Sequence, residues 1–187
     1  STLSYYLSML VRTLIVFLFF AYSLKADQND ARLEDLFDIL SKTESEDQIN
    51  QVISSIWDIW HETNDPSIEA DFYRGLESMR TGDLLMAVAF FTRVINKNPN
   101  FAEGWNKRAT VYYLLGKFDA SMMDIHETLK LEPRHFGAMD GMGLIFIHFQ
   151  QFDKAIGIYD QMLEIFPNNS STIKKKEMLI NRLSDSA

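Results

Sequence analysis

The sequence predicts an all-α fold, an α-solenoid in which antiparallel helix pairs stack side by side. Three observations predict it. Pro99, Pro133 and Pro167 are each 34 residues apart. Small and bulky residues recur at fixed places between these prolines. Apolar residues also recur at helical spacing between the turn signals, and a fixed period of this length indicates stacked helical units.

The composition fits a globular domain and excludes several classes of function. The chain has 187 residues, of which 47% are hydrophobic, and this is enough for one domain with a proper core. The net charge is −8, so we expect no nucleic-acid partner, because phosphate binding relies on clustered Lys and Arg. The chain has no cysteine, which excludes disulfides, thiolate zinc sites and a cysteine nucleophile.

Residues 1–26 are expected to lie outside the repeat fold. An apolar segment from Leu3 to Leu24 contains one cationic residue, Arg12, and leads to a small residue, Ala26. This order is typical of a secretory signal cleaved after Ala26, which would place the mature protein outside the cytoplasm, in a bacterial periplasm. The same segment approaches the roughly 20 residues that cross a bilayer, so an uncleaved membrane anchor and a buried core helix stay open. We expect membrane contact only if residues 1–26 are retained.

Residues 27–67 are predicted to form a divergent helical hairpin. Its two helical faces are marked by apolar residues at helical spacing, which are Leu33, Leu36, Phe37 and Leu40, and then Ile49, Val52, Ile53, Ile56, Trp57 and Trp60. Asp65 and Pro66 end the second helix before the repeats begin. The hairpin has repeat-like dimensions but lacks the small residues of the repeats, and we expect it to pack on the first repeat.

Residues 68–169 divide into three rows, 68–101, 102–135 and 136–169. Three columns of this alignment carry the pattern: Gly75, Ala109 and Gly143 at column 8, Ala87, Ser121 and Ala155 at column 20, and Phe91, Ile125 and Tyr159 at column 24. The small residues let two antiparallel helices approach where they cross, and the bulky ones fill the space beside the crossing. Gly82 and Gly116 stand where the first helix of a pair must end and reverse.

This pattern resembles the tetratricopeptide repeat (TPR), a helix–turn–helix unit of the same length. The middle row carries the resemblance best, with Trp105, Ala109, Tyr112, Gly116, Phe118 and Pro133. Column 7 departs from the family, because Arg74 and Arg108 stand where leucine is usual. The composition of the chain also resembles small exported bacterial members of the family.

Residues 170–187 are predicted to form a C-terminal capping helix, because a row of helix pairs needs a polar-faced end. Ser170 or Ser171 is the expected N-cap, and Ile173, Ile180 and Leu183 lie on its apolar stripe. The three lysines 174–176 are either a basic docking patch or, as we favour, the solvated face of this helix.

The resemblance implies that the first helix of each pair lines a concave groove that binds a protein or peptide. The implied partner-binding residues are Phe72, Tyr73, Leu76, Arg80, Asn106, Lys107, Thr110, Tyr113, Asp140, Leu144 and His148. Phe72, Leu76 and Tyr113 are the expected anchors. Some members of the family hold a C-terminal carboxylate with Lys and Asn at four columns, which here read Phe72, Leu76, Gly137 and Gly141. We therefore expect an extended peptide or an amphipathic helix rather than a chaperone tail.

No catalytic set is apparent in the sequence. The four histidines, His61, His126, His135 and His148, form no helical metal-binding pair, and no phosphate-binding glycine motif is present. We expect no enzyme activity, no cofactor and no metal. The predicted function is a non-catalytic protein–protein interaction scaffold of the cell envelope. A membrane-anchored assembly factor and an accessory subunit of an enzyme complex are the alternatives.

Overall fold

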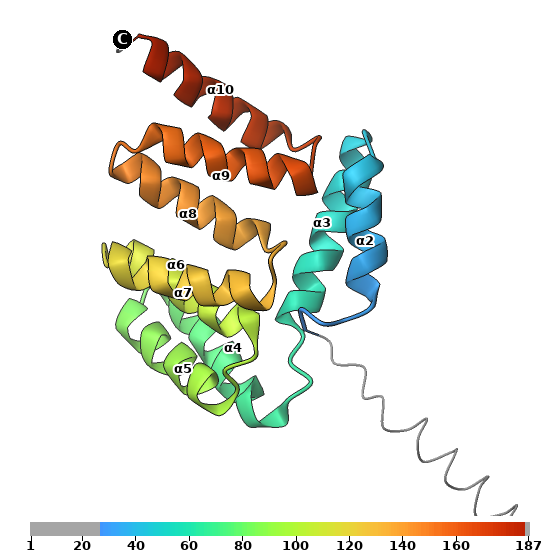
Figure 1. Ribbon diagram of the computed structural model, residues 1–187. Coiled ribbons are helices and arrows are strands. Elements are labelled where there is room, and N and C mark those ends of the chain that lie inside the picture. Colours follow the sequence, from blue (N-terminus) through green and yellow to red (C-terminus); the bar gives the residue numbers. More distant parts are fainter. Residues whose placement is uncertain (1–26, 186–187) are drawn as a thin grey trace, which may run out of the picture.

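The computed structural model describes residues 27–185, and this part of the chain forms nine α-helices and no strand (Figure 1). The all-α solenoid predicted from the sequence is confirmed. The signal or anchor predicted for residues 1–26 lies outside the described residues. Within residues 27–185, no helix combines the length and the apolar character that crossing a membrane requires.

Three helix pairs make up the repeat array. The pairs are α4 (Pro66–Thr81) with α5 (Leu84–Lys97), α6 (Ala102–Leu114) with α7 (Phe118–Leu131), and α8 (Phe136–His148) with α9 (Phe152–Ile165). They are preceded by the hairpin α2 (Arg32–Lys42) and α3 (Glu46–His61), and followed by α10 (Ser170–Ser184). Each helix of the array packs on its neighbours in the chain, and this produces the stack seen in Figure 1.

The reversal within each pair uses one residue in the left-handed backbone region. Gly82 has φ 80° and Gly116 has φ 70°, as the sequence predicts for helix C-caps. In the third pair the same place is taken by Gln150 at φ 57°, so the turn survives the loss of its glycine. A side chain in this region costs free energy because its Cβ crowds the following carbonyl.

The small residues of column 8 lie directly under the bulky residues of column 24. A Cβ added to Gly75 would come within 2.6 Å of the Phe91 ring, and one added to Gly143 would come within 2.8 Å of the Tyr159 ring. Phe91 and Tyr159 are both fully buried. The two helices of a pair therefore reach van der Waals contact because the glycine leaves room for the ring, which is the physical basis of the repeat pattern.

The N-terminal hairpin packs chiefly on the second and third helix pairs and meets the first where His61 faces Phe72, with ring centroids 6.1 Å apart, so the expectation that it packs on the first repeat is wrong. Helix α3 contacts α6 and helix α2 contacts α9, and in Figure 1 the hairpin stands crosswise to the helices α8 and α9. Its apolar residues share one core with residues of α8, α9 and α10. The reason is geometric: a helix pair without small crossing residues cannot extend the stack, but its wide apolar face covers the ends of several repeat helices at once.

The loops between the helix pairs each hydrogen-bond to the N-terminal part of the described chain. Gln28 donates to the Asn100 carbonyl at 2.6 Å, and Asn168 donates to the Thr43 carbonyl at 2.8 Å. Between them, Arg134 pairs with Glu34 at 2.9 Å. Residues 27–61 thus brace the array along the edge that carries the repeat prolines.

Helix α10 packs on α9 and ends the stack. Its N-cap is Asn169, whose side chain accepts a hydrogen bond from the Thr172 amide at 3.1 Å, and not Ser170 or Ser171 as predicted. Lys175 pairs with Asp140 at 2.6 Å and Lys176 pairs with Asp160 at 2.5 Å. Two of the three consecutive lysines therefore attach α10 to the array, which argues against a docking patch.

Candidate functional site

A cavity of about 190 Å³ lies between α6 and α8, with α7 behind it. It lies between the first helices of the second and third pairs, the helices that are expected to line a groove. Helix α6 lines it with Asn106, Ala109, Thr110 and Tyr113, helix α7 with Ser121 and Ile125, and helix α8 with Gly137, Ala138, Asp140, Gly141 and Leu144. We call this cavity and its lining residues the α6–α8 trough.

Helix α8 lines the trough with two glycines, which add no side chain to it. Gly137 and Gly141 are four residues apart and so lie on one face of the helix. A Cβ added to Gly141 would lie 3.4 Å from Cδ1 of Ile125, so even a methyl group there would be in contact with the α7 wall. Ser121 is buried and donates to the Ala109 carbonyl at 2.7 Å, which leaves its hydroxyl hydrogen unavailable to a ligand.

An amide and a carboxylate are among the polar side chains that border the trough. Asn106 is only 5% exposed, and its Nδ2 donates to both oxygens of Glu103 at 3.2 Å. Asp140 accepts from Lys175 of α10, so its charge is balanced within the protein. The trough therefore presents no unbalanced charge to a ligand.

Glu103 on α6 is the centre of a buried polar cluster at the base of the array. Its carboxylate lies 2.9 Å from Nε2 of His135, 3.1 Å from Nε2 of His61 and 3.1 Å from Nζ of Lys107. Nδ1 of His135 accepts the Ala138 amide at 3.1 Å, so the ring hydrogen is on Nε2 and points at Glu103. The cluster joins α3, α6 and α8.

The environment of Glu103 keeps it ionised. Burial by itself would raise its pKa, but the charge of Lys107 and hydrogen bonds from His135 and His61 outweigh burial and hold the pKa of Glu103 far below its usual range. Glu103 stands at one of the groove columns that the resemblance implies, but the sequence does not predict that its side chain is buried in a polar cluster. Lys107 and Asn106 are local partners, but the two histidines come from 42 positions upstream and 32 positions downstream, so no local motif marks the cluster.

Two tryptophans of the hairpin cover the end of the trough nearest to Glu103. Trp60 stacks on the His135 ring with centroids 4.0 Å apart and 10° between planes. A Cβ on Gly137 would come within 2.6 Å of Trp57, so the ring of Trp57 occupies the space that a side chain would need. Lys107 lies 5.2 Å from the centroid of the Trp57 ring. The hairpin thus supplies one wall of the site, and the residues of that wall lie outside the three repeats.

The structure brings five of the predicted groove residues together around the trough, which are Asn106, Thr110, Tyr113, Asp140 and Leu144. Phe72 is wrong as a groove anchor, because it is fully buried against Phe91 and Phe101. In the first pair, the face of α4 that carries Phe72 packs into the hydrophobic core and does not line a groove.

The other predicted groove residues lie outside the trough. Leu76 packs on the core of the first pair, and Lys107 is held by Glu103. Tyr73 and Arg80 are exposed, and Arg80 pairs with Glu77 on its own helix. His148 stacks on Phe118 with centroids 4.1 Å apart.

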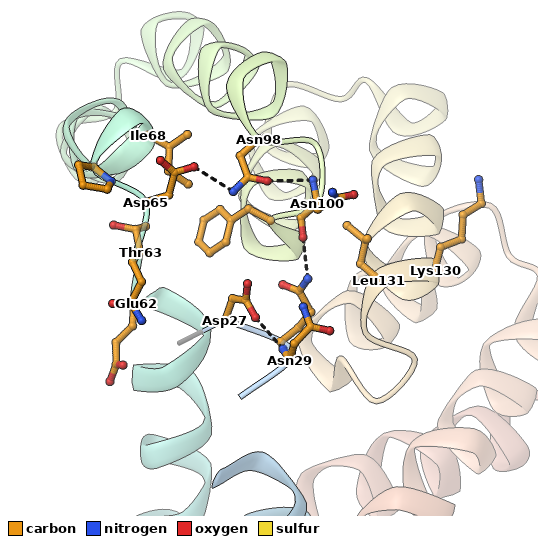
Figure 2. Close-up of a pocket in the computed structure, with 14 residues that line it drawn as sticks. Asp27, Asn29, Glu62, Thr63, Asp65, Ile68, Asn98, Asn100, Lys130 and Leu131 are labelled. Carbon is orange, nitrogen blue, oxygen red and sulfur yellow. Dashed lines mark hydrogen bonds between the residues drawn. The ribbon is translucent and has the colours of Figure 1, made fainter. Parts of the chain in front are cut away.

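A second hollow, of about 590 Å³, lies among the loops beside the start of α4 (Figure 2). Asp27, Glu62 and Asp65 give it a negative charge, but all three carboxylates already have partners, and that of Asp27 is the Asn29 amide at 2.7 Å. Asp65 accepts from Ser67 and Asn98, and these hydrogen bonds, with that from the Ser67 side chain the strongest, lower its pKa. Glu62 pairs with Arg32 at 2.8 Å. The loop hollow is therefore a junction of internal hydrogen bonds, and the α6–α8 trough is the better candidate site.

Metal binding has no support in the described part of the chain. Among residues 27–185, no group of three or more His, Asp and Glu side chains is arranged to hold a metal ion. His61 and His135 each direct a ring nitrogen at the Glu103 carboxylate and not at a shared point between them.

Comparison with known proteins gives relatives of one kind. No family model matches the chain. A TPR repeat-containing protein of Rhizobium etli is 28% identical over 152 residues, which is 81% of this chain and 74% of the relative. Hsp70-Hsp90 organizing protein 1 of Glycine max is 26% identical over 87 residues, 46% of this chain and 15% of the relative. The chain thus spans about three quarters of the first relative and a small part of the second.

Solved structures agree on the fold. The first TPR of Spaghetti (RPAP3) bound to the HSP90 peptide SRMEEVD has a TM-score of 0.59 at 20% identity, over 63% of this chain and 96% of that chain. The TPR2B domain of yeast Sti1 in its pHsp70 complex has a TM-score of 0.58 at 21% identity, over 66% and 100%. The chain is thus similar in sequence to a TPR repeat-containing protein, and it shares the fold of solved TPR domains.

Proposed function

We propose that the protein is a non-catalytic interaction scaffold that binds a peptide or helix of a partner protein in the α6–α8 trough. The observation that carries the proposal is the trough itself, a hollow between the first helices of two neighbouring repeats. TPR domains among the structural neighbours are described in complex with peptides, which supports a peptide partner in general.

The chemistry of the trough favours an uncharged segment over an acidic tail. At the four columns where some members of the family hold a carboxylate, this chain has Phe72, Leu76, Gly137 and Gly141. Phe72 is buried and Gly137 is covered by Trp57. Lys107 is already paired with the buried Glu103, and Lys175 is paired with Asp140. An acidic peptide would therefore lose water without gaining an ion pair.

Selection from a random peptide display library on the full chain would test the proposal. Binders are then compared on two variants, Thr110→Arg in the trough and Met123→Arg as the control. Thr110 is exposed and lines the trough, and Met123 is 69% exposed on α7 and does not line it. We expect Thr110→Arg to weaken selected binders and Met123→Arg to leave them unchanged, and an equal effect of both variants would contradict binding in the trough.

We also propose a location in the cell envelope. Its support is the apolar segment of residues 3–24 that follows the expected pattern of an export signal. The mass of the mature protein purified from its natural source tests this. Loss of residues 1–26 supports an exported scaffold, and their retention in a membrane fraction supports the alternative of a membrane-anchored assembly factor.

A further inference from the structure

We propose that the hairpin α2–α3 is a pH-sensitive switch, which docks on the array while Glu103 is ionised and leaves the array as one unit when Glu103 takes up a proton. Release of the hairpin uncovers the end of the α6–α8 trough that Trp57 closes. The proposal does not depend on which ligand the trough binds.

The Glu103 cluster lies in the interface between the hairpin and the array. His61 of α3 approaches Oε1 of Glu103 from the hairpin, at 3.1 Å. Lys107 of α6 and His135 before α8 approach the same carboxylate from the array, at 3.1 and 2.9 Å. Glu103 is 1% exposed, so its charge is removed from water while the hairpin is docked.

Two tryptophans of the hairpin cover the array partners of Glu103. The Nζ of Lys107 lies 5.2 Å from the centroid of the Trp57 ring, and the fully buried His135 ring stacks on Trp60. A cation held in this position needs the charge of Glu103, because a buried charge that loses its partner is strongly destabilising. Neutral Glu103 therefore favours an arrangement in which the cluster returns to water, and departure of the hairpin provides it.

The array does not need the hairpin to hold its own helices together. Residues 62–65, which join the hairpin to α4, form no helix, and each helix of the array packs on its neighbours in the chain. The apolar core that the hairpin shares with α8, α9 and α10 favours docking at neutral pH. The ion pair of Arg134 with Glu34 also crosses the interface, but the Glu34 side chain is 76% exposed, and such pairs contribute little.

The direction of the pH dependence follows from the two environments of Glu103. In the docked state burial raises the pKa of Glu103, but Lys107 and the hydrogen bonds from His135 and His61 outweigh burial and hold the pKa well below 4.5. In the released state the carboxylate is in water and ionises near 4.5. Docking is therefore fully favoured above about pH 4.5 and weakens as the pH falls below that value.

The two histidines do not reverse this direction. His61 and His135 can each donate to Glu103 from Nε2 whether the ring is neutral or protonated. Their titration therefore leaves the contacts with Glu103 in place, and the acid dependence of docking follows Glu103.

Fluorine NMR of 5-fluorotryptophan observes the hairpin and the array separately. The chain has three tryptophans, of which Trp57 and Trp60 lie on α3, and Trp105 lies on α6 with its Nε1 bonded to the Pro99 carbonyl at 2.8 Å. Urea titrations of the labelled full chain are recorded at several pH values between 7 and 3. They give the release constant, which is the ratio of released to docked hairpin.

We expect the signals of Trp57 and Trp60 to reach their released positions at a lower urea concentration than the signal of Trp105. The release constant should rise by about tenfold per pH unit below about pH 4.5, as the uptake of one proton requires. Loss of all three signals in a single transition at every pH would overturn the proposal.

Glu103→Gln removes the titrating group and keeps the size of the side chain. We expect its hairpin signals to change at a lower urea concentration than those of the parent at pH 7, because the charge that holds Lys107 is gone. The steep dependence below pH 4.5 should also be absent. An acid dependence equal to that of the parent would overturn the proposal.

Two histidine variants keep the test decisive if Glu103→Gln does not fold. His61→Ala removes the hydrogen bond of the hairpin to Glu103, and His126→Ala is the matched control at an exposed position on α7. We expect His61→Ala to raise the release constant about tenfold, the effect of losing one hydrogen bond to a charged group, and to retain the acid dependence. His126→Ala should leave the release constant unchanged, and equal effects of the two variants would contradict the proposal.

Discussion

The packing of glycine under an aromatic ring gives a prediction that tests the basis of the repeat. We compare Gly143→Ala on α8 with Gly157→Ala on α9. At Gly143 the added Cβ would lie 2.8 Å from Cε1 and Cζ of Tyr159 and 2.9 Å from its hydroxyl oxygen. Tyr159 is fully buried, so its ring has no solvent-facing space into which it can move. At Gly157 nothing lies within 4 Å of the added atom.

The expected magnitude follows from two terms. Replacing a helical glycine by alanine stabilises a helix by about 1 kcal/mol, and both variants gain this term. Only Gly143→Ala overpacks the core, which costs about 1–3 kcal/mol. The difference in the free energy of unfolding between the variants is therefore the overpacking term alone, about 1–3 kcal/mol, with Gly143→Ala the less stable.

Urea unfolding followed by far-UV circular dichroism measures both variants and the parent under one condition. Gly157→Ala should be more stable than the parent by about 0.5–1 kcal/mol. Equal stability of the two variants would refute the reasoning, because it would mean that the ring over Gly143 is not in tight contact and that the glycine columns do not set the distance between the helices.

Three further predictions concern single residues. Glu103→Ala should lower the free energy of unfolding by about 3–5 kcal/mol near neutral pH, because buried donors lose their acceptor. The folded protein depresses the pKa of Glu103 from 4.5, so its contribution to the free energy of unfolding is present above about pH 4.5 and declines as the pH falls below that value. The difference in stability between the parent and the variant should therefore narrow in acid. Urea titrations at several pH values measure this difference. Gln150→Gly should raise stability by about 1 kcal/mol in thermal melts, because φ at this position is 57°; a lower melting temperature would contradict this. Asn169→Ala removes the acceptor of the Thr172 amide and should cost about 1 kcal/mol; unchanged amide exchange at the start of α10 would count against that cap.

The array could be predicted because its information is local and repeated. A proline that ends a helix, a glycine that permits a turn and a small residue that permits a crossing each act within one unit, and three copies in register make the pattern visible. The left-handed turn at Gln150 shows that the pattern tolerates the loss of one signal, since the neighbouring helices impose the turn.

The site could be predicted only in part. Thr110, Tyr113 and Leu144 line the trough as the repeat columns imply. Phe72 stands at the same groove column as Asn106 but is fully buried, because the rings of Phe91 and Phe101 pack against it. The column of a residue in the repeat alignment predicts only which side of its helix the side chain is on. Whether that direction leads to solvent or to another element depends on the neighbours.

The sequence by itself determined the helix pairs, their turns and the contacts within each pair, because these depend on residues fewer than 34 positions apart and on the permitted backbone angles of glycine and proline. Only the tertiary structure decided where the hairpin lies, and with it the burial of Glu103 and the closure of the trough by Trp57. Those features join side chains that are 32 to 42 residues from Glu103 or that approach a glycine from another element. An apolar helix face in the sequence predicts that another surface will cover it, but it does not predict which one, because the hydrophobic effect is non-directional.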